Sequence, residues 1–426
     1  MDESVKERGR HIMKERKGQM PNKDIEVLRG LANELAEISA LPVQQERKQQ
    51  WYHLNARKVD KPMFLMGEFP WNEMNIDDEL TLRCEDSFYQ EMETILRRLL
   101  YRNKHIQDDW VYEPLIYIPK VIHGFHYGLE IVEEKLTRDD GNTVEAHSYT
   151  SQLKEWDDID KIQVPGLWLD ENETDRREEM AKEAVGDILK VIMDGPRFCY
   201  SPWDYFMMWS DIDTLYDKML YDEDWVHALM RRTLDVHLGI ISKLRDMDCL
   251  NRQQQVVHCT GAWTDLLPEN PQKPDFKDVW TYGMAQILYT VSPEMHDEFE
   301  FQYASEWYDK FGLGYYGCCE PLDDRMEYVK KIKGIHKISV SAWVKDFERM
   351  AEEMEGKYVY SNKPAPAFVA SPGWNPETVE KDLRTRLNAA RKYNCPVEFT
   401  LKDISTVCYQ PKRLTEWSEI MRKVIG

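Results

Sequence analysis

The sequence of 426 residues contains no long apolar run, no low-complexity tract and no excess of positive charge. No run approaches the roughly 20 apolar residues that a membrane-spanning helix needs, and the first residues lack the apolar core of a secretory signal. The net charge of −21 disfavours nucleic acid and anionic membranes as partners, because binding them requires clustered positive charge. These absences predict a soluble protein.

Cysteines are few for so long a chain and do not form a compact framework. The eight cysteines are scattered between positions 84 and 408, whereas small disulfide-stapled domains concentrate theirs. This usage indicates a reducing compartment, so we expect a cytoplasmic protein. Hydrophobic residues make up 42% of the chain and aromatic residues 12%, which is enough for a large core.

Eight short β-rich segments alternate with longer helical patterns. The segments are residues 61–66, 110–118, 197–203, 254–260, 313–319, 336–343, 357–363 and 395–401. Strand–helix alternation repeated eight times predicts an α/β fold, a (β/α)₈ TIM barrel with its helices outside. An open doubly wound sheet is the alternative, but "GEFPWNEM" follows the first segment where that fold usually has a glycine-rich phosphate turn.

Two regions fall outside the repeating pattern. Residues 1–60 are polar and helical in periodicity and precede the first strand, so they predict a helical N-terminal cap. Residues 61–426 would form the barrel. Within it, residues 122–196 indicate an insertion between the second and third strands, with a small hairpin as a lid over the barrel mouth.

The carboxyl ends of the predicted strands gather chemically active side chains. In such barrels the active site lies at this end. The side chains expected there are Tyr200, Trp203, Asp204, His258, Cys259, Asp265, Cys318, Cys319, Glu320, Asn362, Lys363, Lys402 and Asp403. Thiol, imidazole and carboxylate groups on one rim are the ligands that zinc prefers, and thiolates argue against magnesium or calcium.

Two ligand sets fit the sequence. One set combines His258 or Cys259 with Cys318 or Cys319. Adjacent residues on a strand point to opposite faces of the sheet, so two adjacent residues rarely bind the same ion. The other combines Asp275, His296 and Cys318, which are 21 and 22 positions apart. Ordinary explanations also exist for each residue: buried cysteines pack as small apolar groups, and a loop aspartate caps helices or faces solvent.

An apolar pocket is expected beside this rim. The segment "FCYSPWDYFMMW" follows the third predicted strand and can wall a site for an aromatic ligand, although barrel core is the alternative. The predicted substrate contacts are Tyr200, Trp203, Trp263, Tyr316 and Asn362. Asp265, Glu320 and His258 are the candidate catalytic residues, the two carboxylic acids as proton donors.

Several segments resemble the uroporphyrinogen decarboxylase superfamily. They are "VSPEMHDEF", "FGLGYYGCCEPLDDR", "HKISVSAW", "YVYSNKPAPA" and "PVEFTLKDISTVCYQPKRLTEW". With "CEDSFYQEMETILRRLLYRNKHIQDDWVYEP", the resemblance covers most of residues 50–426. It is similar to a bacterial branch described as uroporphyrinogen decarboxylase-like or cobalamin-independent methionine synthase-like, and the superfamily fold is a (β/α)₈ barrel.

The resemblance implies a corrinoid-dependent O-demethylase component. Such a methyltransferase takes a methyl group from a small-molecule methyl ether, here a methoxylated aromatic, and hands it to the cobalt of a separate corrinoid protein. Some of these enzymes use zinc held by a carboxylate, a His and a Cys, which makes Asp275, His296 and Cys318 the preferred set. Cys319, Glu320 and His258 remain as neighbours or substitutes, and a homodimer is a family-level expectation.

The chain also departs from the superfamily. "FLMGEFPWNEM" is acidic where the true decarboxylase has basic residues, and Thr260 stands where the His-x-Cys pattern of the thiol-methylating branch needs a cysteine. Tetrapyrrole decarboxylation and methyl transfer to coenzyme M are therefore not expected. Two alternatives remain, a metal-free lyase that uses Asp265 and His258 as acid and base, and a non-catalytic barrel that binds a small molecule.

Overall fold

A computed structural model describes residues 23–136 and 146–426. Within them, eight strands run parallel in two groups, one of six and one of two. The larger group has the order β1-β14-β13-β12-β11-β10, and β2 pairs with β7. The strands are β1 (Met63–Met66), β2 (Leu115–Pro119), β7 (Lys190–Asp194), β10 (Trp280–Gly283), β11 (Leu313–Tyr316), β12 (Ile335–Val340), β13 (Val359–Asn362) and β14 (Val397–Leu401).

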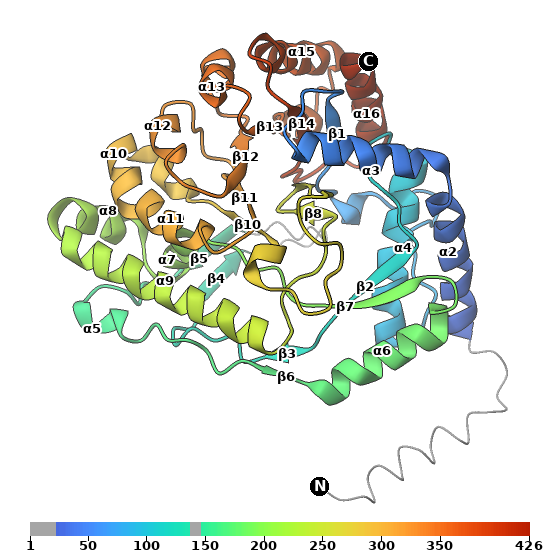
Figure 1. Ribbon diagram of the computed structural model, residues 1–426, viewed down its shortest axis with the longest axis horizontal. Coiled ribbons are helices and arrows are strands. Elements are labelled where there is room, and N and C mark those ends of the chain that lie inside the picture. Colours follow the sequence, from blue (N-terminus) through green and yellow to red (C-terminus); the bar gives the residue numbers. More distant parts are fainter. Residues whose placement is uncertain (1–22, 137–145) are drawn as a thin grey trace, which may run out of the picture.

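A few hydrogen bonds outside the strand ladders link the two groups. Tyr200, six residues after β7, forms a parallel bridge with Gly283 of β10. On the other side, the backbone N–H of Asp109 donates to the carbonyl of Phe64 in β1 (2.9 Å). The arrangement is a TIM-barrel-like α/β fold, with strands around the middle of the molecule and helices outside (Figure 1).

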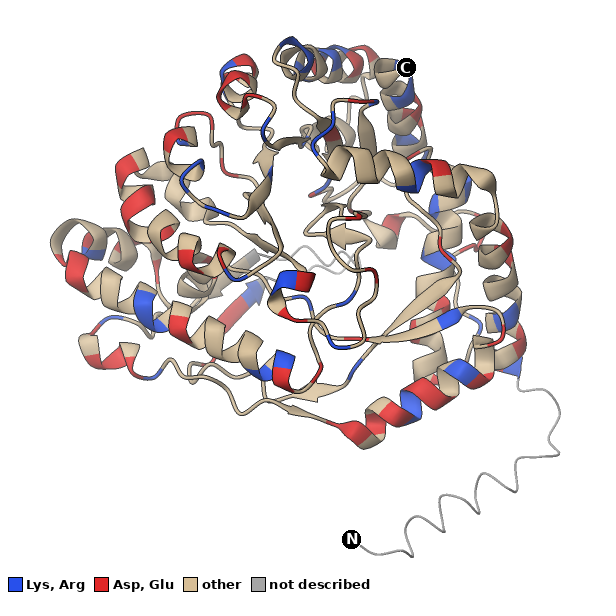
Figure 2. Cartoon of the chain, in the orientation of Figure 1, with Lys and Arg blue, Asp and Glu red and all other residues tan. Residues whose placement is uncertain are grey.

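In Figure 2 the charged residues lie mainly along the outer helices and loops, and the longer helices also contribute buried apolar residues to the core. The α-helices are α2 (Lys23–Ser39), α3 (Pro42–Asn55), α4 (Ser87–His105), α5 (Trp156–Ile159), α6 (Glu171–Val185), α7 (Pro202–Trp209), α8 (Ile212–Tyr221), α9 (Glu223–Asp246), α10 (Pro293–His296), α11 (Gln302–Tyr308), α12 (Met326–Val329), α13 (Phe347–Met354), α14 (Ala367–Ala370), α15 (Pro376–Lys392) and α16 (Lys412–Ile425). Shorter 3₁₀ turns are η1 (Trp71–Glu73), η2 (Phe276–Asp278) and η3 (Gln286–Thr290), and η4 (Asp297–Phe301) is a π-helix.

The helices α2 and α3 precede β1, and residues 1–22 of the predicted N-terminal cap lie outside the described residues. Trp51 of α3 packs against Trp263 with ring centroids 5.7 Å apart. The Asn55 side chain donates to the carbonyl of Trp263 (2.7 Å). The cap therefore contacts the segment that follows residue 260.

The insertion is shorter than the predicted 122–196. Its strands form two antiparallel pairs, β3 (Ile122–His123) with β6 (Trp168–Leu169) and β4 (Glu133–Leu136) with β5 (Ala146–Tyr149), and the short helix α5 lies between β5 and β6. Helix α6 and strand β7 then follow, and β7 is one of the eight parallel strands. The third strand therefore begins at Lys190, earlier than the predicted 197–203.

The predicted fourth strand, 254–260, is wrong. These residues form an antiparallel hairpin, β8 (Val256–Val257) and β9 (Thr260–Gly261). His258 begins the two-residue turn with φ of 54°, in the left-handed region, and Lys337 of β12 donates to the carbonyl of Gly261 (2.6 Å). The position in the parallel array belongs instead to β10, a four-residue strand that the sequence pattern does not predict.

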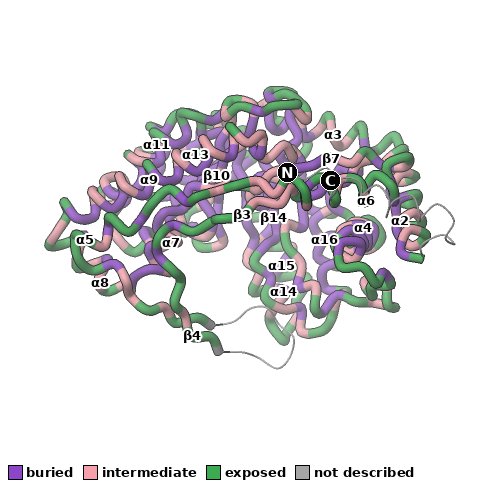
Figure 3. The backbone as a smooth tube through the Cα atoms, turned by 90° about the horizontal axis from the view of Figure 1, so that it is seen from below, coloured by how far each residue is buried: buried purple, intermediate pink, exposed green. Residues whose placement is uncertain are grey.

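Burial follows this architecture. Figure 3 shows buried backbone in the interior and exposed backbone on the outer turns. The strands β1, β12, β13 and β14 are buried along their whole length, as expected for parallel strands covered by helices. In the part of the chain that the structure describes, no helix combines the length and apolar character needed to cross a bilayer.

Candidate functional site

A glycine turn at the end of β11 sets the direction of the two adjacent cysteines. Gly317 has φ of 95°, and a Cβ at this position would lie 2.9 Å from Cβ of Ser339, so a larger residue does not fit. The backbone N–H of Cys318 donates to Glu320 Oε2 (2.8 Å) and the Ser339 hydroxyl donates to the carbonyl of Cys318 (2.8 Å). These bonds fix the thiols at the carboxyl end of the strand.

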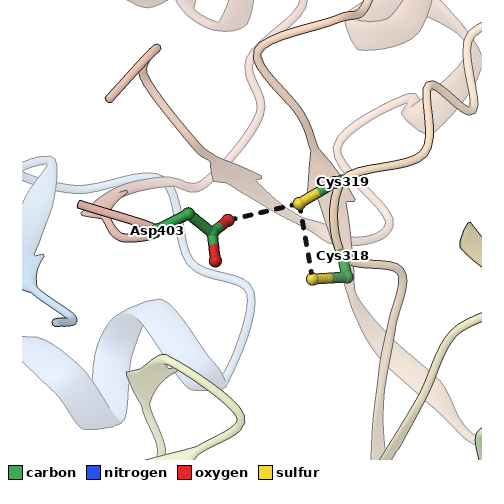
Figure 4. A group of neighbouring side chains, drawn as sticks. All are labelled: Cys318, Cys319 and Asp403. Atoms are coloured by element: carbon green, nitrogen blue, oxygen red, sulfur yellow. Dashed lines mark hydrogen bonds between the residues drawn. The ribbon is translucent and has the colours of Figure 1, made fainter. Parts of the chain in front are cut away.

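Cys318, Cys319 and Asp403 form a compact thiol–carboxylate cluster (Figure 4). The sulfur atoms are 3.7 Å apart, and the Cys319 thiol donates to Asp403 Oδ2 (3.2 Å). Asp403 follows β14 with φ of 57°, and β13 and β12 lie between β14 and β11 in the sheet. One ligand atom from each residue lies within 4.8 Å of the other two, a spacing that suits a metal ion.

Two buried lysines give the cluster a positive surrounding. Lys402 Nζ donates to Cys318 Sγ (3.1 Å), and Lys363 Nζ donates to the carbonyl of Cys318 (3.1 Å). The Cys319 thiol lowers the pKa of Cys318 by hydrogen bonding, and Lys363 lowers it further against the opposing effect of burial. The pKa of Cys319 is raised by the same hydrogen bond. The hydrogen bond between them therefore favours the thiolate form of Cys318 and the thiol form of Cys319.

His258 completes the surroundings of Cys318. Its ring stacks on Tyr282 at 5.2 Å, and its buried Nε2 has no hydrogen-bond partner among the described residues. Burial, with the neighbouring Lys363 charge, lowers its pKa to about 4, although the Cys318 side chain interacts with it. His258 is thus a neutral imidazole with an unused nitrogen, held in a left-handed turn of the kind that occurs at functional sites.

A cavity of about 1130 Å³ adjoins this region, and His258 is part of its wall. It extends along the junction between β1 and β2, where no strand ladder closes the wall. Aromatic side chains predominate among its larger lining residues, namely Phe69, Trp71, Trp110, Tyr112, Tyr117 and Phe125. A cavity of this size, with apolar walls and a few polar groups, is typical of a small-molecule site.

The structure does not bring together the predicted metal set of Asp275, His296 and Cys318. Asp275 is an exposed cap of η2 whose side chain accepts from the backbone N–H of Phe276 (2.8 Å). His296 is buried, and its Nδ1 accepts from Arg325 Nε (3.1 Å). Only Cys318 belongs to the three-ligand cluster found among the described residues.

The candidate acids also separate. Asp265 is exposed, because the β8–β9 hairpin reverses the chain and carries the following residues toward α3. The expected acid–base pair of Asp265 and His258 is therefore not assembled. Glu320 stays beside Cys318, but it is 1% exposed and accepts from the backbone N–H of Cys318 and Ala285 (3.3 Å). Burial, reinforced by the Cys318 charge, raises the pKa of Glu320 to about 7.

None of the five predicted substrate contacts lines the large cavity. Tyr200, Trp203 and Tyr316 are fully buried core residues. Trp263 packs against α3, and Asn362 accepts from Arg386 (3.2 Å). Sequence position alone placed these side chains near the rim, whereas the aromatic wall comes mainly from residues after β1 and in or near β2.

Other groups of the site were recognisable only as strand-end residues. Lys363 follows β13, and Lys402 and Asp403 follow β14, so the barrel pattern marked their positions without their roles. Asp204, near the bridge at Tyr200, has a pKa raised to about 6 by burial and then by the Cys318 charge. It is therefore a titratable carboxyl in the electrostatic neighbourhood of the thiols.

No family model matches the chain, and no curated protein matches it. Among solved structures, the chain is similar to a methyltransferase from Methanosarcina mazei, with a TM-score of 0.51 and 10% sequence identity. The match covers 89% of this chain and 99% of that chain. At this level of identity, the likeness shows a shared fold.

Proposed function

We propose that this chain is a zinc-dependent methyltransferase that takes a methyl group from a methyl ether and passes it to the cobalt of a separate corrinoid protein. The observation that carries the proposal is the cluster of Cys318, Cys319 and Asp403 at the carboxyl ends of parallel strands, where barrel enzymes perform their chemistry. The resemblance to the corrinoid-dependent branch of the uroporphyrinogen decarboxylase superfamily supplies the reaction class, and the fold shared with a methyltransferase agrees with it.

The donor set fits zinc. Two of its three ligand atoms are sulfur, which zinc accepts and magnesium or calcium does not. Cys318, Cys319 and Asp403 would hold the ion, and the unpartnered Nε2 of buried His258 offers a further nitrogen beside Cys318. Bound zinc would act as a Lewis acid toward the ether oxygen as the alkoxide or phenolate leaving group develops charge.

The lysines and Glu320 prepare the cluster. Lys402 and Lys363 compensate negative charge in a buried environment, where an unpaired thiolate would be costly. Glu320 accepts hydrogen bonds from the backbone N–H groups of Ala285, just after β10, and Cys318, just after β11. These bonds hold the turn at Cys318 in place. We assign it a positioning role, in place of the proton donation that the sequence suggested.

Asp204 is the better candidate for the acid that protonates the demethylated product. Its pKa of about 6 leaves a protonated fraction near neutral pH, which is the range in which general acids work well. It also senses the Cys318 charge, unlike Asp265, whose exposed loop follows the reversing hairpin. Asp204 therefore takes the role that was expected of Asp265.

The partner would dock at the end of the ring that carries the cluster. Trp343 follows β12 and is 68% exposed, and Tyr409 follows β14 and is 64% exposed. Large exposed aromatic side chains are typical of protein interaction surfaces. Their position on strand-end loops suits a corrinoid protein that must bring its cobalt to the site. The homodimer and the cytoplasmic location stay predictions.

Methyl transfer from a panel of methoxylated aromatics to a reduced corrinoid protein tests the function. We expect methylation of the cobalt, followed by its absorbance, with the native chain and with Cys408→Ser. Cys408 is a half-buried cysteine that is not part of the cluster, and its thiol donates to the carbonyl of Ala370 (3.2 Å). Cys318→Ser should lower the rate by at least about 100-fold, in line with losses at metal sites. Equal rates for the native chain and Cys318→Ser would contradict the proposal.

A further inference from the structure

Four cationic side chains line the large cavity, although the chain as a whole is strongly acidic. Two of them are already neutralised by carboxylates. Arg102 Nε donates to Asp108 Oδ2 (2.8 Å), and Lys120 Nζ lies 3.4 Å from Asp248 Oδ2. The remaining two, Arg98 and Arg197, have no ion pair in the part of the chain that the structure describes.

Arg98 and Arg197 differ in what their guanidinium groups contact. The Arg98 group lies over the Trp71 ring, 4.8 Å from its centroid, and so already has an aromatic partner. Among the described residues, the Arg197 guanidinium has one hydrogen bond, to the amide oxygen of Gln253. Arg197 lines the cavity and is an exposed residue. An arginine offers five N–H donors, so Arg197 has further donors that can bind a ligand.

The acidic groups near Arg197 are occupied by other partners. Asp194 accepts from the Asn251 side chain (2.7 Å) and from the backbone N–H of Gly195 (3.0 Å). The charge of Asp194 attracts the Arg197 guanidinium, but the two side chains form no ion pair in the described part of the chain. Glu113, also in the cavity wall, is paired with Lys48 (3.0 Å). The fork of Arg197 is therefore available to an anionic group from outside the chain.

Arg197 is connected to the thiol cluster through neighbouring rings. Tyr282 contributes to the electrostatic field at Arg197 and stacks on His258 at 5.2 Å. His258 in turn interacts with Cys318, and both Arg197 and His258 line the same cavity. A ligand between them would have the aromatic side chains of the cavity along its length.

We propose that Arg197 anchors a carboxylate of the substrate, so that the methyl donor is an aromatic ether that carries an acid group. The planar fork of an arginine matches a carboxylate in a bidentate manner, and the aromatic walls select a ring. The methyl-ether part of this inference rests on the proposed function, whereas the carboxylate anchor rests on the cavity alone.

Calorimetric titration of the purified full chain with two probes tests the anchor at pH 7.5, without corrinoid partner. The probes are 4-methoxybenzoate and its neutral isostere 4-methoxybenzamide. The native chain should bind the carboxylate at least tenfold more tightly than the amide. Arg197→Met should weaken carboxylate binding by about 10- to 100-fold, the range for charge-assisted hydrogen bonds, and change amide binding less than threefold. The affinity of Arg197→Lys for the carboxylate should lie between those of the native chain and Arg197→Met, because lysine keeps the charge but lacks the bidentate guanidinium group.

Arg98→Met is the matched control, because it removes the same charge from the same cavity and should keep the preference for the carboxylate. Circular dichroism verifies that each variant is folded. The anchor is contradicted if the native chain binds both probes equally or neither, if Arg197→Met keeps the preference, or if Arg98→Met loses as much. A carboxylate preference without methyl transfer would refute the proposed function alone, and transfer from neutral ethers that is insensitive to Arg197 would refute the anchor alone.

Discussion

Lys402 Nζ lies 3.1 Å from Cys318 Sγ, and the two residues come from the ends of β14 and β11. Both are nearly inaccessible, with 4% and 3% of their surface exposed. Buried charges are stabilised when they are paired. The ammonium group of Lys402 therefore favours a thiolate at Cys318, and that thiolate favours the charged lysine. This pair is the electrostatic centre of the candidate metal site.

The first prediction concerns the ionisation of Cys318 in the metal-free protein. Because its folded pKa is lowered, the native chain should show one more thiolate than Cys318→Ser at pH 6, measured as absorbance at 240 nm. Lys402→Met should move this ionisation to higher pH, whereas Lys412→Met, an exposed lysine at the start of α16, should not. Identical absorbance of the native chain and Cys318→Ser at pH 6 would show that Cys318 is an ordinary thiol.

A second prediction tests the pH dependence of the reaction. If Asp204 donates a proton, its protonated form is the active one, so the rate of a single turnover should fall as pH rises above about 6. Asp204→Asn should have a lower single-turnover rate, and that rate should not show the fall above about pH 6. Asp265→Asn, which changes an exposed carboxylate, should keep it. A native limb that survives in Asp204→Asn would remove Asp204 from the mechanism.

The third prediction concerns a buried ion pair between β12 and β14. Lys337 Nζ lies 2.9 Å from Glu398 Oε2, and both side chains are fully buried. Lys337→Met leaves the carboxylate unpaired, so the free energy of unfolding in urea should fall by about 3–5 kcal/mol. Adding Glu398→Leu should recover part of this loss. The exposed Lys330–Glu353 pair is the control, and Lys330→Met should cost under about 1 kcal/mol. Equal costs for the two lysines would contradict the assignment.

Glu300 of the π-helix η4 provides a fourth prediction, on stability against pH. Burial raises its pKa to about 8, so the folded chain binds a proton that the unfolded chain releases above about pH 4.3. The folded state therefore loses stability as pH rises from about 4 to 8, on the order of a few kcal/mol. Glu300→Gln should remove this slope, and Glu298→Gln on the same helix should retain it. An unchanged slope in Glu300→Gln would assign the effect to other groups.

The strands of the second half were predictable because long β-branched and aromatic runs marked them. The segments 313–319, 336–343, 357–363 and 395–401 correspond to β11, β12, β13 and β14. The hairpin at 256–261 was read as a strand because the same apolar residues suit either structure, and the left-handed turn at His258 is a tertiary feature. The sequence pattern does not predict strand β10, because the short turns η2 and η3 flank it where the other strands are marked by alternation with longer helices.

The sequence predicts where the site lies better than it predicts which residues form it. Strand ends identified Cys318, Cys319 and His258, and the spacing of His296 and Asp275 suggested ligands that the structure places in other contacts. Asp403 lies 84 positions from Cys319, and only the closing of β14 against β1 and β13 brings it near. The cavity depends on the missing ladder between β1 and β2, which no local pattern encodes.

The most direct test is metal analysis of the chain purified without chelators. The thiol–carboxylate cluster predicts about one zinc ion per chain, retained in Cys408→Ser and lost in Cys319→Ser and Asp403→Asn. Purified native chain without zinc, or variants of the cluster that keep the native zinc content, would contradict the assignment of this site.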